Sequence, residues 1–210
     1  MYKSGFKTWF LIPLVVLVGV AIFALLKFLS SDNGQIANSQ INTSATQNQQ
    51  VEASQSASSL NTPLPIFNLP NIDEPNQILS NSDLPNEPFL LNVWGSWCTT
   101  CAVEHPYLMQ LARSDVPIVG VNFGDTPDEA TAYLNEHGNP FELSMQDEAG
   151  ELVDALGVVG APETFLIDTD GTIRQHLVGE LSSEVWQTQF EPCFSELQVA
   201  DKAIVTHACD

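Results

Sequence analysis

The stretch NVWGSWCTTCAVEHP, residues 92–106, sets two cysteines two residues apart directly after an apolar run. That run, residues 87–94 (EPFLLNVW), is typical of a strand buried on both faces. Residues 101–113 then carry apolar side chains at helical spacing, namely Val103, Tyr107, Leu108 and Leu111. A second apolar run, residues 117–123 (PIVGVNF), repeats the pattern of the first. Together they predict a strand–helix–strand unit with two parallel strands.

The rest of the chain predicts further elements of both kinds. Residues 127–137 begin with Pro and two acids and end against Gly138, as helices do. We also expect a strand at 141–145, a short helix at 148–156, hairpin strands at 163–167 and 172–178, and a last helix at 182–190 that ends before Pro192. Parallel strands followed by a hairpin and a terminal helix, with C-x-x-C at the first strand-to-helix junction, predict an α/β fold of the thioredoxin type.

The C-x-x-C spacing puts both cysteines at the start of the predicted helix. If the helix begins near Cys98, its sulfur lies beside unpaired backbone N–H groups at the positive end of the helix dipole, which favours the thiolate. Cys101 lies one turn later and can attack a mixed disulfide formed at Cys98. The spacing therefore predicts dithiol–disulfide chemistry, with Cys98 as the nucleophile.

Two structural alternatives exist for this pair, half of a zinc site and a plain structural disulfide. A closed zinc site needs two more ligands, and the remaining cysteines, Cys193 and Cys209, lack paired spacing. His105 is a weak candidate ligand, because its place on the helix is more typical of a surface residue. We expect neither a metal nor an organic cofactor. Pro106 interrupts the helix, where it costs a hydrogen bond and bends the axis.

The N-terminal part of the chain has a different composition. Residues 9–26 are an uncharged run, about 27 Å long as a helix and close to bilayer thickness. Lys3 and Lys7 precede the run, which favours a cytoplasmic N-terminus, and Lys27 follows it. A cleavable signal peptide is the alternative, but no small-x-small cleavage site follows the run. We expect an uncleaved signal anchor.

After the anchor the chain is polar before it becomes globular. The polar stretch is rich in Ser, Asn, Gln, Thr and Ala, with only Asp32 and Glu52 charged, which is typical of a flexible tether. The pattern predicts five segments: a cytoplasmic N-terminus at 1–8, a transmembrane signal anchor at 9–29, a disordered polar linker at 30–62, a thioredoxin-like domain at 63–198 and a C-terminal extension at 199–210.

The chain is strongly acidic, with a formal net charge of −20 at pH 7. All 26 acidic residues follow residue 30, where Arg113, Arg174 and Lys202 are the only Lys or Arg side chains. Such a surface repels phosphates, so nucleic acid is excluded as a partner. The surplus carboxylates either keep the domain soluble or attract a basic partner surface.

These residues resemble one family, the DsbE/CcmG-type thiol:disulfide interchange proteins of cytochrome c biogenesis. The resemblance runs from about residue 64 to residue 194. It rests on three motifs: LLNVWGSWCTTCAVEHPYL (90–108), GNPFELSMQDEAGELVDALGVVGAPETFLIDTDG (138–171) and GEL (179–181). The segment GVVGAPETFLID is the most specific, since C-x-x-C alone would admit any thioredoxin relative.

The resemblance implies a thioredoxin-like fold with an inserted segment and an active site at Cys98 and Cys101. It also implies a cis peptide before Pro162. With a cis bond there, the backbone of Ala161 is free to pair with an extended substrate strand beside Cys98. Trp97 belongs to the same substrate groove by resemblance. A simple tight turn is the alternative at Pro162.

The resemblance implies a function and a location as well. Similar proteins are held in the bacterial inner membrane by a single span, with the catalytic domain in the periplasm. They reduce the disulfide in the C-x-x-C-H haem-attachment motif of apocytochrome c, receive electrons from an integral-membrane thiol transporter and act with other cytochrome c maturation proteins. We therefore expect a thiol-disulfide oxidoreductase, acting as a protein-disulfide reductase.

Three acids are expected to tune the dithiol. Glu104 lies one turn beyond Cys101 on the predicted helix, and the resemblance brings Glu163 and Glu180 towards the same groove. Each negative charge disfavours the thiolate and raises its pKa, which makes the dithiol more reducing. Solvated surface acids without a redox role are the alternative.

Three other functions are compatible with the same residues. A general periplasmic disulfide reductase would share the same site. A disulfide-forming oxidase would place basic or His side chains near Cys98, where the sequence offers acids. A non-enzymatic acidic docking module of the maturation machinery would retain its function without Cys98.

The tail beyond Phe194 departs from the family pattern. Cys193 and Cys209 can form a disulfide in an oxidising compartment, closing a loop of about 15 residues. Two free thiols, or a bond to another chain, are the alternatives.

Overall fold

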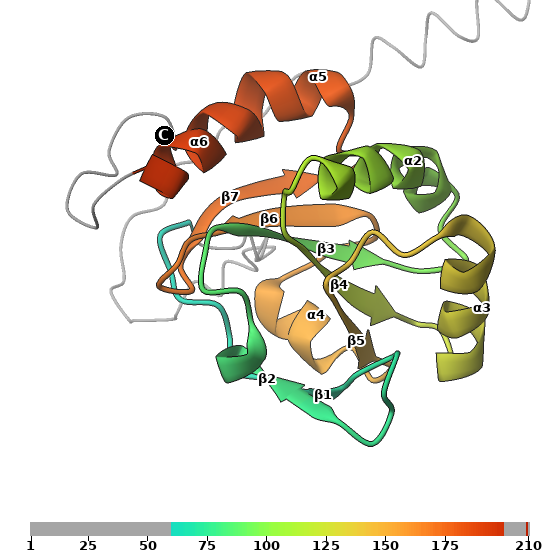
Figure 1. The fold of residues 1–210 in the computed structure, drawn as a ribbon. Helices are drawn as coiled ribbons and strands as arrows, with labels where there is room; N and C mark the ends of the chain where they lie inside the picture. The colour runs from blue at the N-terminus through green and yellow to red at the C-terminus, as the bar shows by residue number, and fades with distance from the viewer. Residues whose placement is uncertain (1–59, 200–208, 210) are drawn as a thin grey trace, which may run out of the picture. The chain divides into compact units, whose positions relative to one another are not determined.

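The computed structural model describes residues 60–199 and residue 209 (Figure 1). The predicted cytoplasmic N-terminus, the predicted signal anchor and nearly all of the predicted linker lie outside the described residues, as does most of the predicted C-terminal extension. The predicted thioredoxin-like domain, residues 63–198, is described throughout. Within this part of the chain, no helix combines the length and apolar character needed to cross a membrane.

A five-stranded mixed sheet forms the centre of the domain (Figure 1). Its strands in spatial order are β5 (Leu143–Asp147), β4 (Ile118–Phe123), β3 (Phe89–Trp94), β6 (Glu163–Ile167) and β7 (Ile173–Val178). Strands β3, β4 and β5 are parallel, whereas β6 is antiparallel to both β3 and β7. The predicted parallel pair and the predicted hairpin are both present. The domain therefore has a mixed α/β, thioredoxin-like architecture.

The helices follow the order α2 (Thr99–Arg113), α3 (Pro127–His137), α4 (Glu151–Leu156), α5 (Ser183–Val185), the π-helical turn η3 (Trp186–Phe190) and α6 (Glu191–Val199). Helix α3 has the predicted bounds. A capping box between Thr126 and Glu129 fixes its start, and Gly138 with a positive φ ends it. Helix α3 and strand β5 lie between β4 and α4 in the chain and add a strand at the β4 edge of the sheet.

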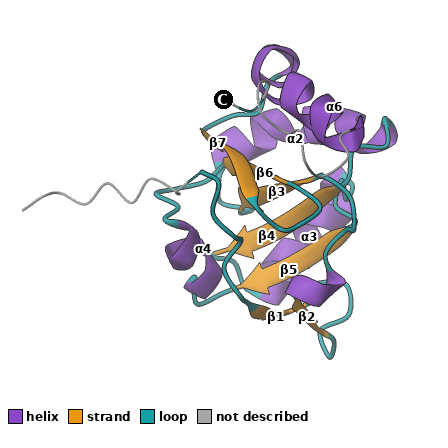
Figure 2. Ribbon diagram, turned by 90° about the vertical axis from the view of Figure 1, so that its left-hand side faces the viewer, coloured by secondary structure: helices purple, strands orange, loops and turns teal. Residues whose placement is uncertain are grey.

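Helices cover both faces of the sheet (Figure 2). On one face Leu90 of β3 packs with α2, α3 and the C-terminal helices in a single apolar cluster. On the other face Leu91 packs with α4 and with a small hairpin in a second cluster. Because neighbouring residues of a strand point to opposite faces, β3 is buried along its whole length, and it is apolar at every position except Asn92. This accounts for the run that dominates the sequence there.

The small hairpin of β1 (Asn68–Pro70) and β2 (Ile78–Ser80), followed by the 3-10 turn η2 (Asn81–Asp83), was not predicted. Its strands have three residues each, too few for an alternating pattern to stand out. It is attached to the sheet edge, since the Ile72 N–H donates to the Ser144 carbonyl at 2.8 Å. The hairpin thereby extends the domain beside β5.

One expectation about helices is wrong. The last helix does not end before Pro192, because α5, η3 and α6 follow one another without a break to Val199. In the π turn the Glu191 N–H donates to the Trp186 carbonyl, so the chain is widened just before a proline that has no N–H to donate. Val103, one of the residues that indicated α2, is 63% exposed. The buried face of α2 consists instead of Cys101, Glu104, His105, Leu108 and Leu111.

Candidate redox-active site

Cys98 and Cys101 form a disulfide at the N-terminus of α2. Cys98 is the N-cap residue, and its sulfur accepts a hydrogen bond from the Cys101 N–H at 3.0 Å. Both side chains are nearly buried. In the reduced protein a Cys98 thiolate at this position faces the free N–H groups and the positive end of the helix dipole. The helix thus starts where the C-x-x-C argument required, and the nucleophilic role of Cys98 stays a prediction.

A buried carboxylate holds the loop that leads into Cys98. Asp125 accepts hydrogen bonds from the backbone N–H and the hydroxyl of Ser96, both at 2.7 Å. The same carboxylate accepts a bond from Asn122 Nδ2 at 2.7 Å. A buried carboxylate requires such partners, and charge-assisted bonds of this kind are strong. Asp125 therefore ties the loop after β3 to the end of β4, next to the redox pair.

Trp97 presents an aromatic surface immediately before Cys98. Its ring is 51% exposed, while the indole N–H donates to the Phe123 carbonyl at 2.9 Å. Gly95 lies so close beneath the indole that any Cβ there would collide with it, and Gly124 has a φ of 75°. These contacts hold the Trp97 ring in place. Its assignment to a substrate groove stays a prediction.

Glu104 lies one turn beyond Cys101 on the buried face of α2 and is 1% exposed. One carboxylate oxygen accepts a bond from Asn92 Nδ2 at 2.9 Å, and the other accepts from the Leu181 N–H at 2.8 Å. Burial raises the pKa of Glu104 from 4.5 to about 7, although both hydrogen bonds oppose the rise. Glu104 therefore exchanges its proton near neutral pH, one helical turn from a redox cysteine.

Glu163 lies on the other side of the sheet. Thr164, its neighbour in β6, faces α2 and accepts a bond from Asn92, so Glu163 points to the opposite face. There its carboxylate accepts bonds from the N–H groups of residues 159 and 160 and contacts His176 Nε2 at 2.7 Å. The expectation that Glu163 joins Glu104 in one groove is therefore corrected: the sheet separates the two carboxylates.

Glu180 is exposed. It is the residue before Leu181, whose N–H binds Glu104. The negative charge of Glu180 adds to the rise in the pKa of Glu104, after the larger effects of burial and hydrogen bonding. Of the three predicted acids, the structure brings Glu104 and Glu180 together. Their influence on the dithiol stays a prediction.

The Ala161-Pro162 peptide bond is cis, as the resemblance implied. The Pro162 carbonyl accepts a bond from the Gly179 N–H at 2.9 Å, which joins the start of β6 to the GEL segment. Ala161 packs against the same apolar cluster that contains Cys98 and Cys101. The structure thus gathers these segments, distant in sequence, around the disulfide.

His105 is buried, and the expectation of a surface histidine is wrong. Its Nε2 lies 3.0 Å from the Gly138 carbonyl, at the end of α3, where helices leave carbonyls without an intrahelical partner. Burial lowers the pKa of His105, so the neutral imidazole joins α2 to α3. Among the described residues, no group of three His, Cys, Asp or Glu side chains is arranged to hold a metal ion.

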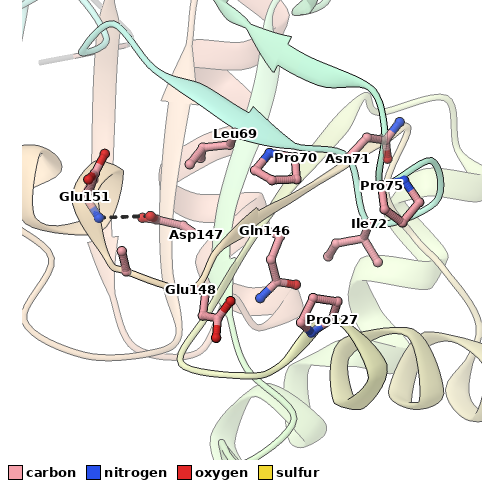
Figure 3. Close-up of a pocket in the computed structure, with 11 residues that line it drawn as sticks. Leu69, Pro70, Asn71, Ile72, Pro75, Pro127, Gln146, Asp147, Glu148 and Glu151 are labelled. Atoms are coloured by element: carbon pink, nitrogen blue, oxygen red, sulfur yellow. Dashed lines mark hydrogen bonds between the residues drawn. The ribbon is translucent and has the colours of Figure 1, made fainter.

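A pocket of about 290 Å³ lies at the C-terminal end of β5 (Figure 3). Because β3, β4 and β5 are parallel, this is the end of the strands at which the redox pair also lies. Its walls are largely aliphatic and proline side chains, including Leu69, Pro70, Ile72, Pro75 and Pro127. Gln146 also lines it, and its amide donates to Asn122 Oδ1 at 3.0 Å and to the Asp125 carbonyl at 2.8 Å. The pocket is thereby linked to the loop that carries Cys98.

Cys193 of α6 forms a disulfide with Cys209. The Cys193 side chain is fully buried within the cluster that covers the α2 face of the sheet. The bond fixes residue 209 against α6. No free cysteine is found among the described residues.

The polar network beneath the redox pair was missed by sequence reasoning. Asn92 and Asn122 each interrupt an apolar strand, in EPFLLNVW and PIVGVNF. A polar side chain inside a buried strand is a usable signal, because such a group must find hydrogen-bond partners. Asp125 carried no comparable signal, since an acid just after a strand is typical of an exposed loop.

Comparison with known proteins places these features in a family. The Redoxin family model matches residues 59–189. The thiol:disulfide interchange protein DsbE of Pseudomonas aeruginosa is 46% identical over 135 residues, covering 64% of this chain and 75% of the relative. DsbE of Yersinia pestis is 35% identical over 198 residues, covering 93% of this chain and 97% of the relative.

Solved structures show the same fold. A secreted thiol-disulfide isomerase from Corynebacterium glutamicum superimposes with a TM-score of 0.53 at 24% identity, covering 59% of this chain and 81% of that chain. A thioredoxin family protein from Chlorobium tepidum gives 0.50 at 24% identity, with 60% and 91% covered. At this identity the likeness supports the thioredoxin-like fold alone.

The sequence matches span most of the described domain, and the C-x-x-C disulfide at the start of α2 supplies the chemistry that the relatives' names state. The expected family and enzyme class are both confirmed. The chain belongs to the Redoxin family and is a thiol-disulfide oxidoreductase of the DsbE/CcmG type.

Proposed function

We propose that the protein reduces the disulfide in the C-x-x-C-H motif of apocytochrome c during cytochrome c maturation. The observation that carries the proposal is the buried acid, Glu104, one turn beyond the Cys98–Cys101 pair. A nearby negative charge disfavours the Cys98 thiolate and so favours the disulfide form of the enzyme. A dithiol of this kind gives up its electrons readily, which suits a reductase.

The reaction moves two electrons from the enzyme to the substrate. The Cys98 thiolate attacks one sulfur of the substrate disulfide, forms a mixed disulfide and releases the other substrate sulfur as a thiolate. Cys101 loses its proton and attacks the Cys98 sulfur, which releases the second substrate thiolate. The Cys98–Cys101 disulfide, the form present in the structure, is left behind. A membrane thiol transporter then returns two electrons.

Glu104 is placed to accept the proton from Cys101. The two residues are three apart on one helix, so their side chains are neighbours on its buried face. With a pKa raised to about 7 by burial, the Glu104 carboxylate is a stronger base than an exposed acid. Deprotonated Glu104 accepts the Cys101 proton in the second step. It later gives this proton to the released thiolate through solvent.

The substrate strand is proposed to lie between Trp97 and Ala161. Ala161 packs on the same cluster as both cysteines, and its backbone forms no backbone hydrogen bond with the described residues. Its N–H and carbonyl are therefore available to an extended peptide. The aliphatic pocket in Figure 3 lies at the same edge of the sheet and offers a place for an apolar side chain of the substrate.

We place the catalytic domain in the periplasm, tethered to the inner membrane by residues 9–29. Three observations support this: the uncharged run in that segment, the alignment with the Yersinia pestis relative that reaches into it, and the Cys193–Cys209 disulfide, which is typical of an oxidising compartment. Other cytochrome c maturation proteins are the expected partners there.

A reduction assay tests the proposal. The full chain, reduced beforehand, is mixed with an oxidised peptide containing C-x-x-C-H and with an oxidised peptide of unrelated sequence. We expect faster reduction of the first peptide, and no reduction of either by Cys98→Ser. The double variant Cys193→Ser, Cys209→Ser serves as the matched control and should retain the rate. Equal rates for both peptides would leave a general disulfide reductase and contradict the cytochrome assignment.

A further inference from the structure

Basic side chains are few in the described residues, and they are unevenly placed. There are five of them: His105, Arg113, His137, Arg174 and His176. Arg174 pairs with Asp168, and His176 contacts Glu163, each at 2.7 Å. In residues 60–199 and 209, the other three have no acidic partner. All three line one pocket.

This pocket, of about 300 Å³, lies between α2 and α3. Helix α2 contributes Ala102, directly after Cys101, then Pro106 and Met109 along its length, and Arg113 near its end. Helix α3 contributes Tyr133 and His137. No acidic side chain lines the pocket, although the chain as a whole has a net charge of −20. The pocket thus combines an apolar floor with a basic rim.

The three basic groups have different parts in its construction. His105 is buried against the Gly138 carbonyl and joins the two helices, so it forms a wall of the pocket. Its ring stands edge-on to Tyr133 with centroids 5.3 Å apart, and Tyr133 contacts the His137 ring at 4.5 Å. Arg113 and His137 are exposed. They are the side chains that can donate hydrogen bonds to a ligand, and Arg113 also offers a positive charge.

We propose that this pocket binds an organic carboxylate with an apolar body. The Arg113 guanidinium offers the parallel donors that match a carboxylate, and His137 adds a further donor. Pro106, Met109 and Tyr133 give the apolar body a surface to pack on. One permanent charge suits a monoanion better than a phosphate dianion. Elsewhere the acidic domain repels anions, which confines the ligand to this place.

The carboxylate has two sources, a free organic acid or an acidic side chain of a docked polypeptide. Both offer the same chemistry to Arg113. The site lies along the helix that carries the redox pair, beginning beside Cys101, but none of its residues takes part in the thiol exchange. The proposed carboxylate site is therefore independent of the proposed cytochrome substrate, and a negative result for the site would leave the proposed reductase function intact.

Titration of the full chain in neutral detergent tests the site. The probe is 4-phenylbutyrate, and 4-phenylbutyramide is its uncharged match. We expect the acid to shift the NMR signals of Tyr133 and His137, and to bind about fivefold or more tightly than the amide. Arg113→Gln should weaken binding of the acid by a similar factor. Arg174→Gln, which removes the arginine paired with Asp168, should leave it unchanged.

Two peptides identify the source of the carboxylate, acetyl-Phe-Glu-amide and acetyl-Phe-Gln-amide. If the Glu peptide binds more tightly than phenylbutyrate, the pocket serves a polypeptide; if it binds more weakly, the pocket serves a free acid. Equal binding of acid and amide, or undiminished binding by a folded Arg113→Gln variant, would overturn the proposal. Circular dichroism checks that each variant is folded. His137→Gln provides a second variant, which should weaken the binding of 4-phenylbutyrate.

Discussion

Glu104 couples the stability of the domain to the chemistry of its site. Burial raises the pKa of this carboxyl from 4.5 to about 7 in the folded protein, and unfolding returns it to its ordinary value. The folded state therefore holds the Glu104 proton more tightly. The stability that this group contributes is fully present below about pH 4.5 and is lost as the pH rises to about 7, a change on the order of 3 kcal/mol.

Glu104→Gln should flatten this pH dependence. The neutral amide keeps an oxygen that accepts from the Leu181 N–H, but it loses the second oxygen that accepts from Asn92 Nδ2. The cost of this lost hydrogen bond is the same at every pH. Urea unfolding at pH 5 and pH 8 measures the difference. The wild type should lose stability between the two values by more than the variant does, whereas exposed Glu180→Gln should follow the wild type closely. An equal loss of unfolding free energy in the wild type and in Glu104→Gln would show that the Glu104 carboxyl does not cause the pH dependence of stability.

Because the sheet separates the buried acids Glu104 and Glu163, we expect them to affect Cys98 differently. Glu104→Gln should lower the pKa of the Cys98 thiol, because it removes a negative charge on the same side of the sheet. Glu163→Gln should change it far less, since that carboxylate lies on the opposite face and already contacts His176. Thiolate absorbance at 240 nm, followed through a pH titration of the reduced variants, compares them. An equal shift in both would refute the assignment of the tuning acid to Glu104.

Helix α2 is the element that makes the two cysteines chemically different. Cys98 caps the helix, where free N–H groups stabilise a thiolate, while Cys101 lies within the first turn on the buried face. Brief treatment of the reduced protein with iodoacetamide, followed by peptide mass mapping, should find the label on Cys98 first. Labelling of Cys101 ahead of Cys98 would mean that the helix end does not govern reactivity.

Most elements of the domain were predictable because their signals are local. Pro127, the Thr126–Glu129 capping box and Gly138 fix α3 by chemistry within a few residues, and the apolar runs gave β3 and β4. The course of the chain through Pro192 was not predictable from local signals, since Trp186 and Phe190 of the π turn pack in a cluster with residues that are distant in the sequence. The burial of Glu104 and His105 on α2 was not predictable for a similar reason: both side chains are polar, yet tertiary hydrogen bonds bury them.

The site was predictable only in part. The C-x-x-C pair and the cis bond before Pro162 are predictable from short motifs, and Ala161 packs on the cluster that contains both cysteines. The face on which Glu163 lies depends on the register of β6 in the sheet, because a shift of one residue reverses it. Asp125 acts through a loop fold that no motif announces.

At the scale of the whole molecule, the Cys193–Cys209 disulfide joins the chain end to the domain. The two cysteines are 16 residues apart in the sequence, and a disulfide that closes a loop of this length contributes about 3 kcal/mol to stability in the chain-entropy model. The double variant Cys193→Ser, Cys209→Ser should lose roughly that amount in denaturant unfolding and keep its reductase rate. A variant that is as stable as the wild type would show that the bond does not restrain the unfolded chain.

We propose that acids beside the Cys98–Cys101 pair make this domain a reductant. Equilibration of the full chain with a series of glutathione redox buffers, read by alkylation of Cys98, measures the reduction potential directly. We predict a value of about −200 mV or lower, in the range of reducing dithiol proteins, and a higher value for Glu104→Gln. A potential near −120 mV, typical of a strong disulfide-forming oxidase, would contradict the account.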